Sequence, residues 1–184
     1  EVAYYASVSI LLGLMTSKPV AEERYMLAFF RGNLAMCISM QDGKLRTNPN
    51  TEKHGAPVRR AEEPDNTVRL LRFVREGKKE ISLVNFCTHP DVIGGSKISA
   101  DWPGFARRFL EEDISGTSCL FFTGCQGDSN HNDYFKPREE RLHGGRYDHS
   151  RYMGRTVADA AIAVWNEMTP VADDTLFAEC RTIF

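Results

Sequence analysis

The sequence predicts an α/β domain in which a mixed β-sheet is flanked by helices. Three observations lead to this class: two apolar strands joined by a short turn, a helix that begins at an acidic residue, and a further strand followed by a long amphipathic helix. Strands that alternate with helices along a chain are typical of such sheets. The 184 residues suit one domain, predicted to span 1–184. We expect a domain truncated at both ends, and at the N-terminus this expectation rests on a sequence that starts without Met and inside a helical pattern.

Two apolar segments form the predicted centre of the sheet. Residues 67–74 and 80–89 are rich in strand-forming side chains, and the short turn 75–78 joins them. Residues 81–87 are almost continuously apolar, which is typical of a strand buried on both faces. A further buried strand is predicted at Ser118–Thr123.

Helices are predicted before and after that last strand. One begins at Asp101, followed by a proline two residues later, and runs to about Asp113. The other spans Ser150–Met168 and ends before Pro170. Its apolar residues fall on one stripe, as expected of a helix packed on a core: Ala158, Ala161, Ile162 and Trp165.

The ends of the chain and a polar segment complete the pattern. Gln41–Asn66 is polar and rich in Pro, Asn and Gly, and so reads as a long connection. A loop of that length in a compact domain is expected to be functional or mobile. The remaining expected elements are a helix at 1–17, strands at 25–31 and 34–40 around Gly32-Asn33, and a strand at 175–183.

Charge and composition exclude several classes of partner. The net charge is −2 and charges of both signs are interspersed, so neither nucleic acid nor an anionic membrane surface is an expected partner. Residues 2–17 are shorter and more polar than the roughly 20 apolar residues of a membrane span. The five cysteines form no CxxC pair and read as reduced thiols, which favours a cytoplasmic protein. The missing N-terminus leaves secretion open.

Polar clusters follow two of the predicted strands. Thr88-His89-Pro90-Asp91 comes after the strand that is most apolar, and residues 124–132 follow the next strand along the chain. Ligands collect outside the carboxyl ends of strands in α/β sheets, so both clusters face one crevice if these strands are neighbours.

His89 has two interpretations. A histidine at the mouth of a buried strand suits a zinc site, in which a carboxylate often orients the ring. A strand-end histidine that only hydrogen-bonds the backbone is the alternative. Asp101 also has a structural interpretation, because it can simply cap the helix that it begins.

Motifs of other enzyme classes are absent or incomplete, and one alternative stays open. Residues 94–97 lack the spacing of a phosphate-binding loop, and the chain has neither GxSxG nor HExxH. Cys125 beside His131 leaves a cysteine hydrolase open, although buried structural cysteines are commoner than nucleophiles.

Three motifs in series give the chain a resemblance to a known family. They are Asn85-Phe-Cys-Thr-His89-Pro, then Ile98-Ser-Ala-Asp101-Trp-Pro-Gly104, then Phe122-Thr-Gly124-Cys-Gln-Gly127-Asp-Ser-Asn130-His131. In this order they resemble the neutral/alkaline ceramidases, in particular the bacterial branch with a GDxNH motif. The resemblance extends over roughly residues 25–168.

The resemblance implies a metal site and a reaction. Family members hold Zn²⁺ with two histidines, a glutamate and a tyrosine, and His89 matches one of these ligands. The other three ligands are expected outside this chain. The family's metal polarises an amide carbonyl and activates water, which splits an N-acyl lipid into a fatty acid and a sphingoid base.

Two differences from the family bear on the substrate. Asn130 stands where the ceramidases have a serine, with Ser129 one residue earlier, and the family's arginine-bearing stretch reads Ala35-Met36-Cys37. Both differences argue against ceramide itself as the substrate, and neither affects the expectation of a metal site.

The resulting hypothesis is a zinc-dependent hydrolase that cleaves an amide or related bond of a small-molecule or lipid-like N-acyl substrate. His89 is the expected metal ligand, and Asn130 and His131 are the expected oxyanion donor and general acid or base. Asp101 and Asp128 are expected to order loops or orient those groups. The alternative is a binding module or pseudoenzyme that has kept the fold and lost the chemistry.

Overall fold

The computed structural model describes residues 34–35, 37–61, 65–127 and 129–170. The chain divides into two compact units, one of residues 26–165 and one that combines residues 1–25 with 166–184. The helix expected at 1–17 and the strands expected at 25–31 and 175–183 lie outside the described residues. The unit 26–165 contains every element that bounds the candidate site. The prediction of a single domain stays a prediction.

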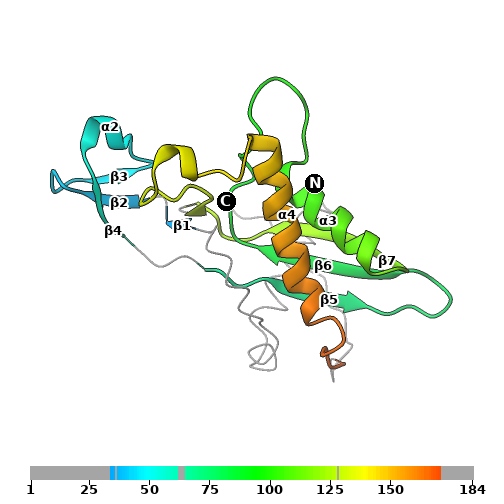
Figure 1. The fold of residues 1–184 in the computed structure, drawn as a ribbon. Helices are drawn as coiled ribbons and strands as arrows, with labels where there is room; N and C mark the ends of the chain where they lie inside the picture. Colours follow the sequence, from blue (N-terminus) through cyan, green and yellow to red (C-terminus); the bar gives the residue numbers. More distant parts are fainter. Residues whose placement is uncertain (1–33, 36, 62–64, 128, 171–184) are drawn as a thin grey trace, which may run out of the picture. The chain divides into compact units, whose positions relative to one another are not determined.

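The main sheet has three strands in the order β5-β6-β7 (Figure 1). The strands are β5 (Arg69–Phe73), β6 (Glu80–Phe86) and β7 (Thr117–Thr123). β5 and β6 form the predicted antiparallel hairpin, whereas β6 and β7 run parallel, with Phe86 opposite Thr123. The sheet is therefore mixed, and the predicted α/β class is confirmed.

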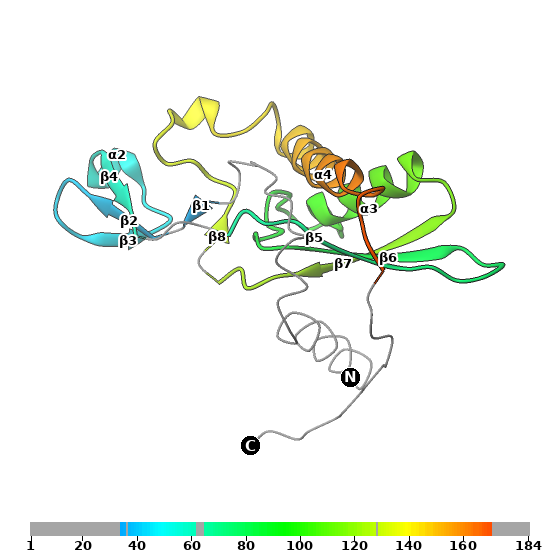
Figure 2. The ribbon, with the colours of Figure 1, turned by 90° about the horizontal axis from the view of Figure 1, so that it is seen from below.

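Two helices cover one face of this sheet side by side (Figure 2). They are α3 (Asp101–Asp113), with the bounds predicted, and α4 (Arg146–Ala163). A Cβ atom on Gly154 of α4 would lie 2.8 Å from the Trp102 carbonyl oxygen of α3, so only glycine permits this close approach. α4 begins four residues before the predicted Ser150, which places His149 in its first turn, and it ends at Ala163 instead of the predicted Met168.

The core lies between the sheet and the two helices. Most of its side chains come from β6, β7, α3 and α4. Of the four residues predicted on one helical stripe, Ala158, Ala161 and Trp165 are buried in the core and Ile162 packs against it. The largest core members are Phe86, Trp102, Phe109, Leu110, Met153, Val157 and Trp165. Within the described residues, no helix is long and apolar enough to cross a membrane.

The segment predicted to be a long loop, Gln41–Asn66, is instead folded. It contains β3 (Leu45–Thr47), α2 (Thr51–His54) and β4 (Pro57–Arg60). β3 and β4 flank β2 (Cys37–Met40) in an antiparallel sheet of order β3-β2-β4. The loop prediction was wrong because this sheet is built from strands of three or four residues, too short to show a period.

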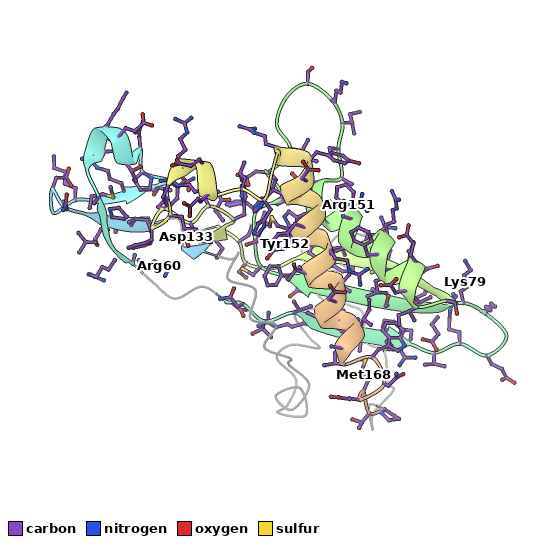
Figure 3. The ribbon with its side chains drawn as sticks, viewed as in Figure 1. Arg60, Lys79, Asp133, Arg151, Tyr152 and Met168 are labelled. Carbon is purple, nitrogen blue, oxygen red and sulfur yellow. The ribbon has the colours of Figure 1, made fainter. Side chains whose placement is uncertain are left out.

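Contacts with a distant segment stabilise the small sheet. Ile38 and Met40 pack against Tyr134, whose hydroxyl donates to Asn48 Oδ1 at 3.0 Å. Arg60 of β4 lies 3.4 Å from the Asp133 carboxylate (Figure 3). The partners follow β8 (Ser129–Asn130), which pairs with β1 (Leu34–Ala35), and precede the 3₁₀ helix η2 (Arg138–Glu140). The predicted strand at 34–40 is thus split between two sheets.

Candidate functional site

The two polar clusters predicted to share a crevice are in contact. β6 and β7 are parallel neighbours, so their carboxyl ends lie at one edge of the sheet. His89 follows β6, and its backbone N–H donates to the Ser129 carbonyl oxygen at 3.2 Å. Asn130 and His131 come directly after Ser129, and both are buried. The structure therefore places the His89 backbone next to the segment that carries Asn130 and His131, and the crevice shared by their side chains stays a prediction.

The Asp91 carboxylate joins the two clusters. Its Oδ2 accepts from Asn130 Nδ2 at 3.4 Å, and its Oδ1 lies 3.4 Å from His131 Nε2. The Asn130 side-chain oxygen in turn accepts the backbone N–H of His131 at 2.6 Å. Sequence reasoning did not select Asp91, although a carboxylate two residues after His89 was a signal that could have found it.

His131 is buried with its ring oriented by Asp91. Burial lowers the pKa of His131 because it disfavours the imidazolium, while the Asp91 and Asp101 carboxylates act in the opposite direction. The nitrogen that faces Asp91 carries the proton of the neutral ring, which leaves Nδ1 as an acceptor. An aspartate that holds a histidine in one tautomer is an arrangement suited to general base chemistry.

A second buried histidine lies beside the first. The His149 ring centroid is 5.1 Å from that of His131, and His149 Nδ1 accepts the backbone N–H of His143 at 3.1 Å. Burial, together with the neighbouring His131 and His143, lowers the pKa of His149 to about 4. Sequence reasoning noted three histidines in this polar segment but chose only His131, because it did not extend the following helix to include His149.

Asp101 has a different environment from Asp91. Its Oδ1 accepts from the Trp102 backbone N–H at 2.6 Å and from the Ser150 hydroxyl at 2.7 Å, and its Oδ2 accepts from the Ile93 N–H at 2.8 Å. These bonds tie the loop after β6 to the starts of both α3 and α4. The residue has a φ of +48°, which aspartate tolerates better than most side chains.

Asp101 does not reach the His89 ring through any hydrogen bond between described residues. Trp102 instead fixes the His89 backbone, because its indole N–H donates to the His89 carbonyl oxygen at 3.1 Å. The N-cap position of α3 is Ala100, so Asp101 is the first helical residue and not the cap. Its contacts are those of a loop-ordering residue.

The His89 ring is the predicted metal ligand, and its role as a ligand stays a prediction. It is half-buried, and it makes no hydrogen bond or ion pair with the part of the chain that the structure describes. Those residues contain no group of three His, Cys, Asp or Glu side chains able to hold a metal. Zinc sites use three or four protein ligands, so the described residues alone do not fit a complete zinc site.

Asp128 and Cys125 are the remaining residues that the sequence analysis selected. Asp128 lies outside the described residues. Cys125 is exposed, and its carbonyl oxygen accepts from the Cys87 thiol. Between described residues no hydrogen bond joins the Cys125 thiol to His131, so the geometry offers the cysteine hydrolase hypothesis no activated nucleophile.

Comparison with known proteins finds similarity only among solved structures. No protein-family model and no curated protein matches the chain. A crystal structure of neutral ceramidase from Pseudomonas aeruginosa is 22% identical over 56% of this chain, with a TM-score of 0.46. A ceramidase complexed with C2 is 22% identical over 57% of this chain, also with a TM-score of 0.46. The similar region spans 17% of each of those chains.

Proposed function

We propose that the protein is a zinc-dependent hydrolase that resembles neutral ceramidase and cleaves an N-acyl amide or a related bond. The observation that supports this most is the cluster at the ends of β6 and β7. There, Asp91 contacts both Asn130 and His131, while the backbone of His89 is bonded to the adjacent Ser129. The order of the motifs that carry these residues is the second support.

Each side chain has a defined part in the proposal. Asp91 orients the His131 ring, whose Nδ1 accepts a proton from an attacking or leaving oxygen and returns it later. Asn130 uses one N–H on Asp91 and has its second N–H for a developing oxyanion. His89 supplies one zinc ligand, and residues other than the described ones supply the rest.

A single variant tests the metal and the reaction together. His89→Ala in the full-length protein should abolish hydrolysis of N-acyl amides and lower the bound zinc measured by mass spectrometry. Because the ring is half-exposed and has no hydrogen bond to any described residue, the stability of the metal-free protein should change by no more than about 1 kcal/mol. His54→Ala on α2 is the matched control and should keep zinc and rate.

The binding-module alternative predicts another result. A full-length wild-type protein that binds no zinc and hydrolyses no N-acyl amide would favour it. Full activity and full zinc content in His89→Ala would end the zinc assignment of His89.

A further inference from the structure

Two buried ring nitrogens beside the candidate site have no hydrogen-bond partner among the described residues. They are His131 Nδ1 and His149 Nε2, on residues that are 7% and 3% exposed. The two rings lie 5.1 Å apart, tilted by 50°. A buried polar atom left without a partner costs about 1 to 3 kcal/mol. Two such atoms on neighbouring rings indicate a ligand that bonds to both.

The contacts of the other nitrogen in each ring determine whether the unpartnered nitrogen is a donor or an acceptor. His131 Nε2 faces the Asp91 carboxylate, so the neutral ring carries its proton there and Nδ1 is an acceptor. His149 Nδ1 accepts the His143 backbone N–H, so the proton of its neutral ring is on Nε2, which is a donor. The pair therefore presents one acceptor and one donor.

We propose that His131 and His149 together bind one hydroxyl group. The hydroxyl donates its hydrogen to His131 Nδ1, and its oxygen accepts from His149 Nε2–H. The inference rests on the proposed function and deepens it, since the hydroxyl belongs either to the N-acyl substrate or to the attacking water. In both cases His149 is a residue of the site that positions this oxygen on the base His131.

Other ligand classes fit the pair less well. A metal ion needs a lone pair on each nitrogen, and His149 Nε2 carries a proton. An anion needs two donors, and His131 Nδ1 is an acceptor. A hydroxyl can donate to one nitrogen and accept from the other, through hydrogen bonds of about 2.7 to 3.0 Å. The low pKa of His149 agrees with a neutral ring.

The kinetic test uses His149→Asn and two matched substrates. Asparagine keeps an acceptor for the His143 N–H and removes the Nε2 donor. The substrates are an N-acylethanolamine and the N-acylethylamine of the same chain length, which lacks the hydroxyl. If the pair binds a substrate hydroxyl, the variant loses about 10- to 100-fold in kcat/KM on the ethanolamide only. If it binds the attacking water, kcat falls by a similar factor on both substrates. His54→Ala should match the wild type.

Unchanged kinetics on both substrates would overturn the inference, since the pair would then hold a structural water only. A second measurement needs no turnover: NMR of the full-length protein labelled with ¹⁵N-histidine reports the tautomers. We expect His131 and His149 both neutral at pH 7 with the proton on Nε2. A proton on His149 Nδ1 overturns the inference even in an active enzyme. Correct tautomers in a wild type that cleaves neither amide would refute the proposed hydrolase and leave the hydroxyl-binding pair standing.

Discussion

Asp91 and Asp101 belong to the same loop between β6 and α3, yet their surroundings differ. The Asp101 residue is 6% exposed and accepts three hydrogen bonds of 2.6 to 2.8 Å. The Asp91 side chain is 54% exposed and has two contacts, both at 3.4 Å. A buried carboxylate with short bonds to backbone and hydroxyl groups maintains the fold. A carboxylate at the surface, loosely bonded to a buried histidine, retains freedom to respond to a substrate.

Removing the charge of Asp91 should have the largest effect on rate. In Asp91→Asn the His131 tautomer is no longer fixed by a carboxylate, so kcat for N-acyl amide hydrolysis should fall by about 10²- to 10³-fold. KM should change little, because the tautomer matters most as the proton moves. Steady-state kinetics would measure kcat and KM, and urea unfolding would measure the stability of the variant.

Stability separates this result from a folding defect. Asp91 is half-exposed, so its variant should lose no more than about 1 kcal/mol. Glu139→Gln, another exposed carboxylate removed in the same way, is the control and should retain the rate. A fully active Asp91→Asn would show that His131 does not act as a base oriented by Asp91.

Asp101→Ala should produce the reverse pattern. It leaves the Ile93 and Trp102 backbone N–H groups and the Ser150 hydroxyl without their acceptor, so unfolding free energy should fall by about 2 to 3 kcal/mol. The rate per folded molecule should fall by less than about 10-fold. Denaturant unfolding beside active-site titration would separate the two effects.

Ser150→Ala offers a graded comparison. It removes one of the three bonds to Asp101 and should cost about 1 kcal/mol. If Asp101→Ala instead lost activity and kept its stability, the contrast between Asp91 and Asp101 would be wrong. Asp101 would then take part in the reaction.

The elements that could be predicted from the sequence are those whose residue pattern is local. The hairpin of β5 and β6 and the start of α3 follow from continuous apolar runs and from an acidic residue before proline. The sheet order β3-β2-β4 could not be predicted, because its side chains are buried by Tyr134, which lies far along the chain. The polar composition of Gln41–Asn66 predicted a loop, because the sequence does not show that this segment packs against Tyr134.

The same distinction applies to the candidate site. His89, Asn130 and His131 could be selected because they follow strands or belong to a motif. Asp91 and His149 were not selected, although Asp91 follows His89 by two residues, because their significance comes from contacts across the fold: Asp91 with Asn130 and His131, and His149 with His131. A single sequence indicates which residues end a strand, and not which side chains they meet there.

Stability should also depend on pH through His149. Its pKa is about 4 in the folded protein and about 6.5 when unfolded, because burial and the nearby His131 and His143 disfavour the charged ring. Between those values the unfolded chain binds a proton that the folded chain does not. Stability should therefore fall as the pH is lowered from 6.5 to 4, by about 1 to 2 kcal/mol once solvent screening is allowed for.

Comparing urea unfolding of the wild type and His149→Asn at pH 7 and at pH 4.5 measures this contribution. The variant should lose less stability than the wild type between the two values, because it has no ring to protonate at this position. The residual loss comes from His131, whose pKa is also lowered. Asp42 and Asp65 have pKa values lowered from the ordinary carboxyl range, so their contributions disappear only at more acidic pH and do not confuse the comparison. Equal losses in both proteins would mean that the His149 ring is not held neutral by its surroundings.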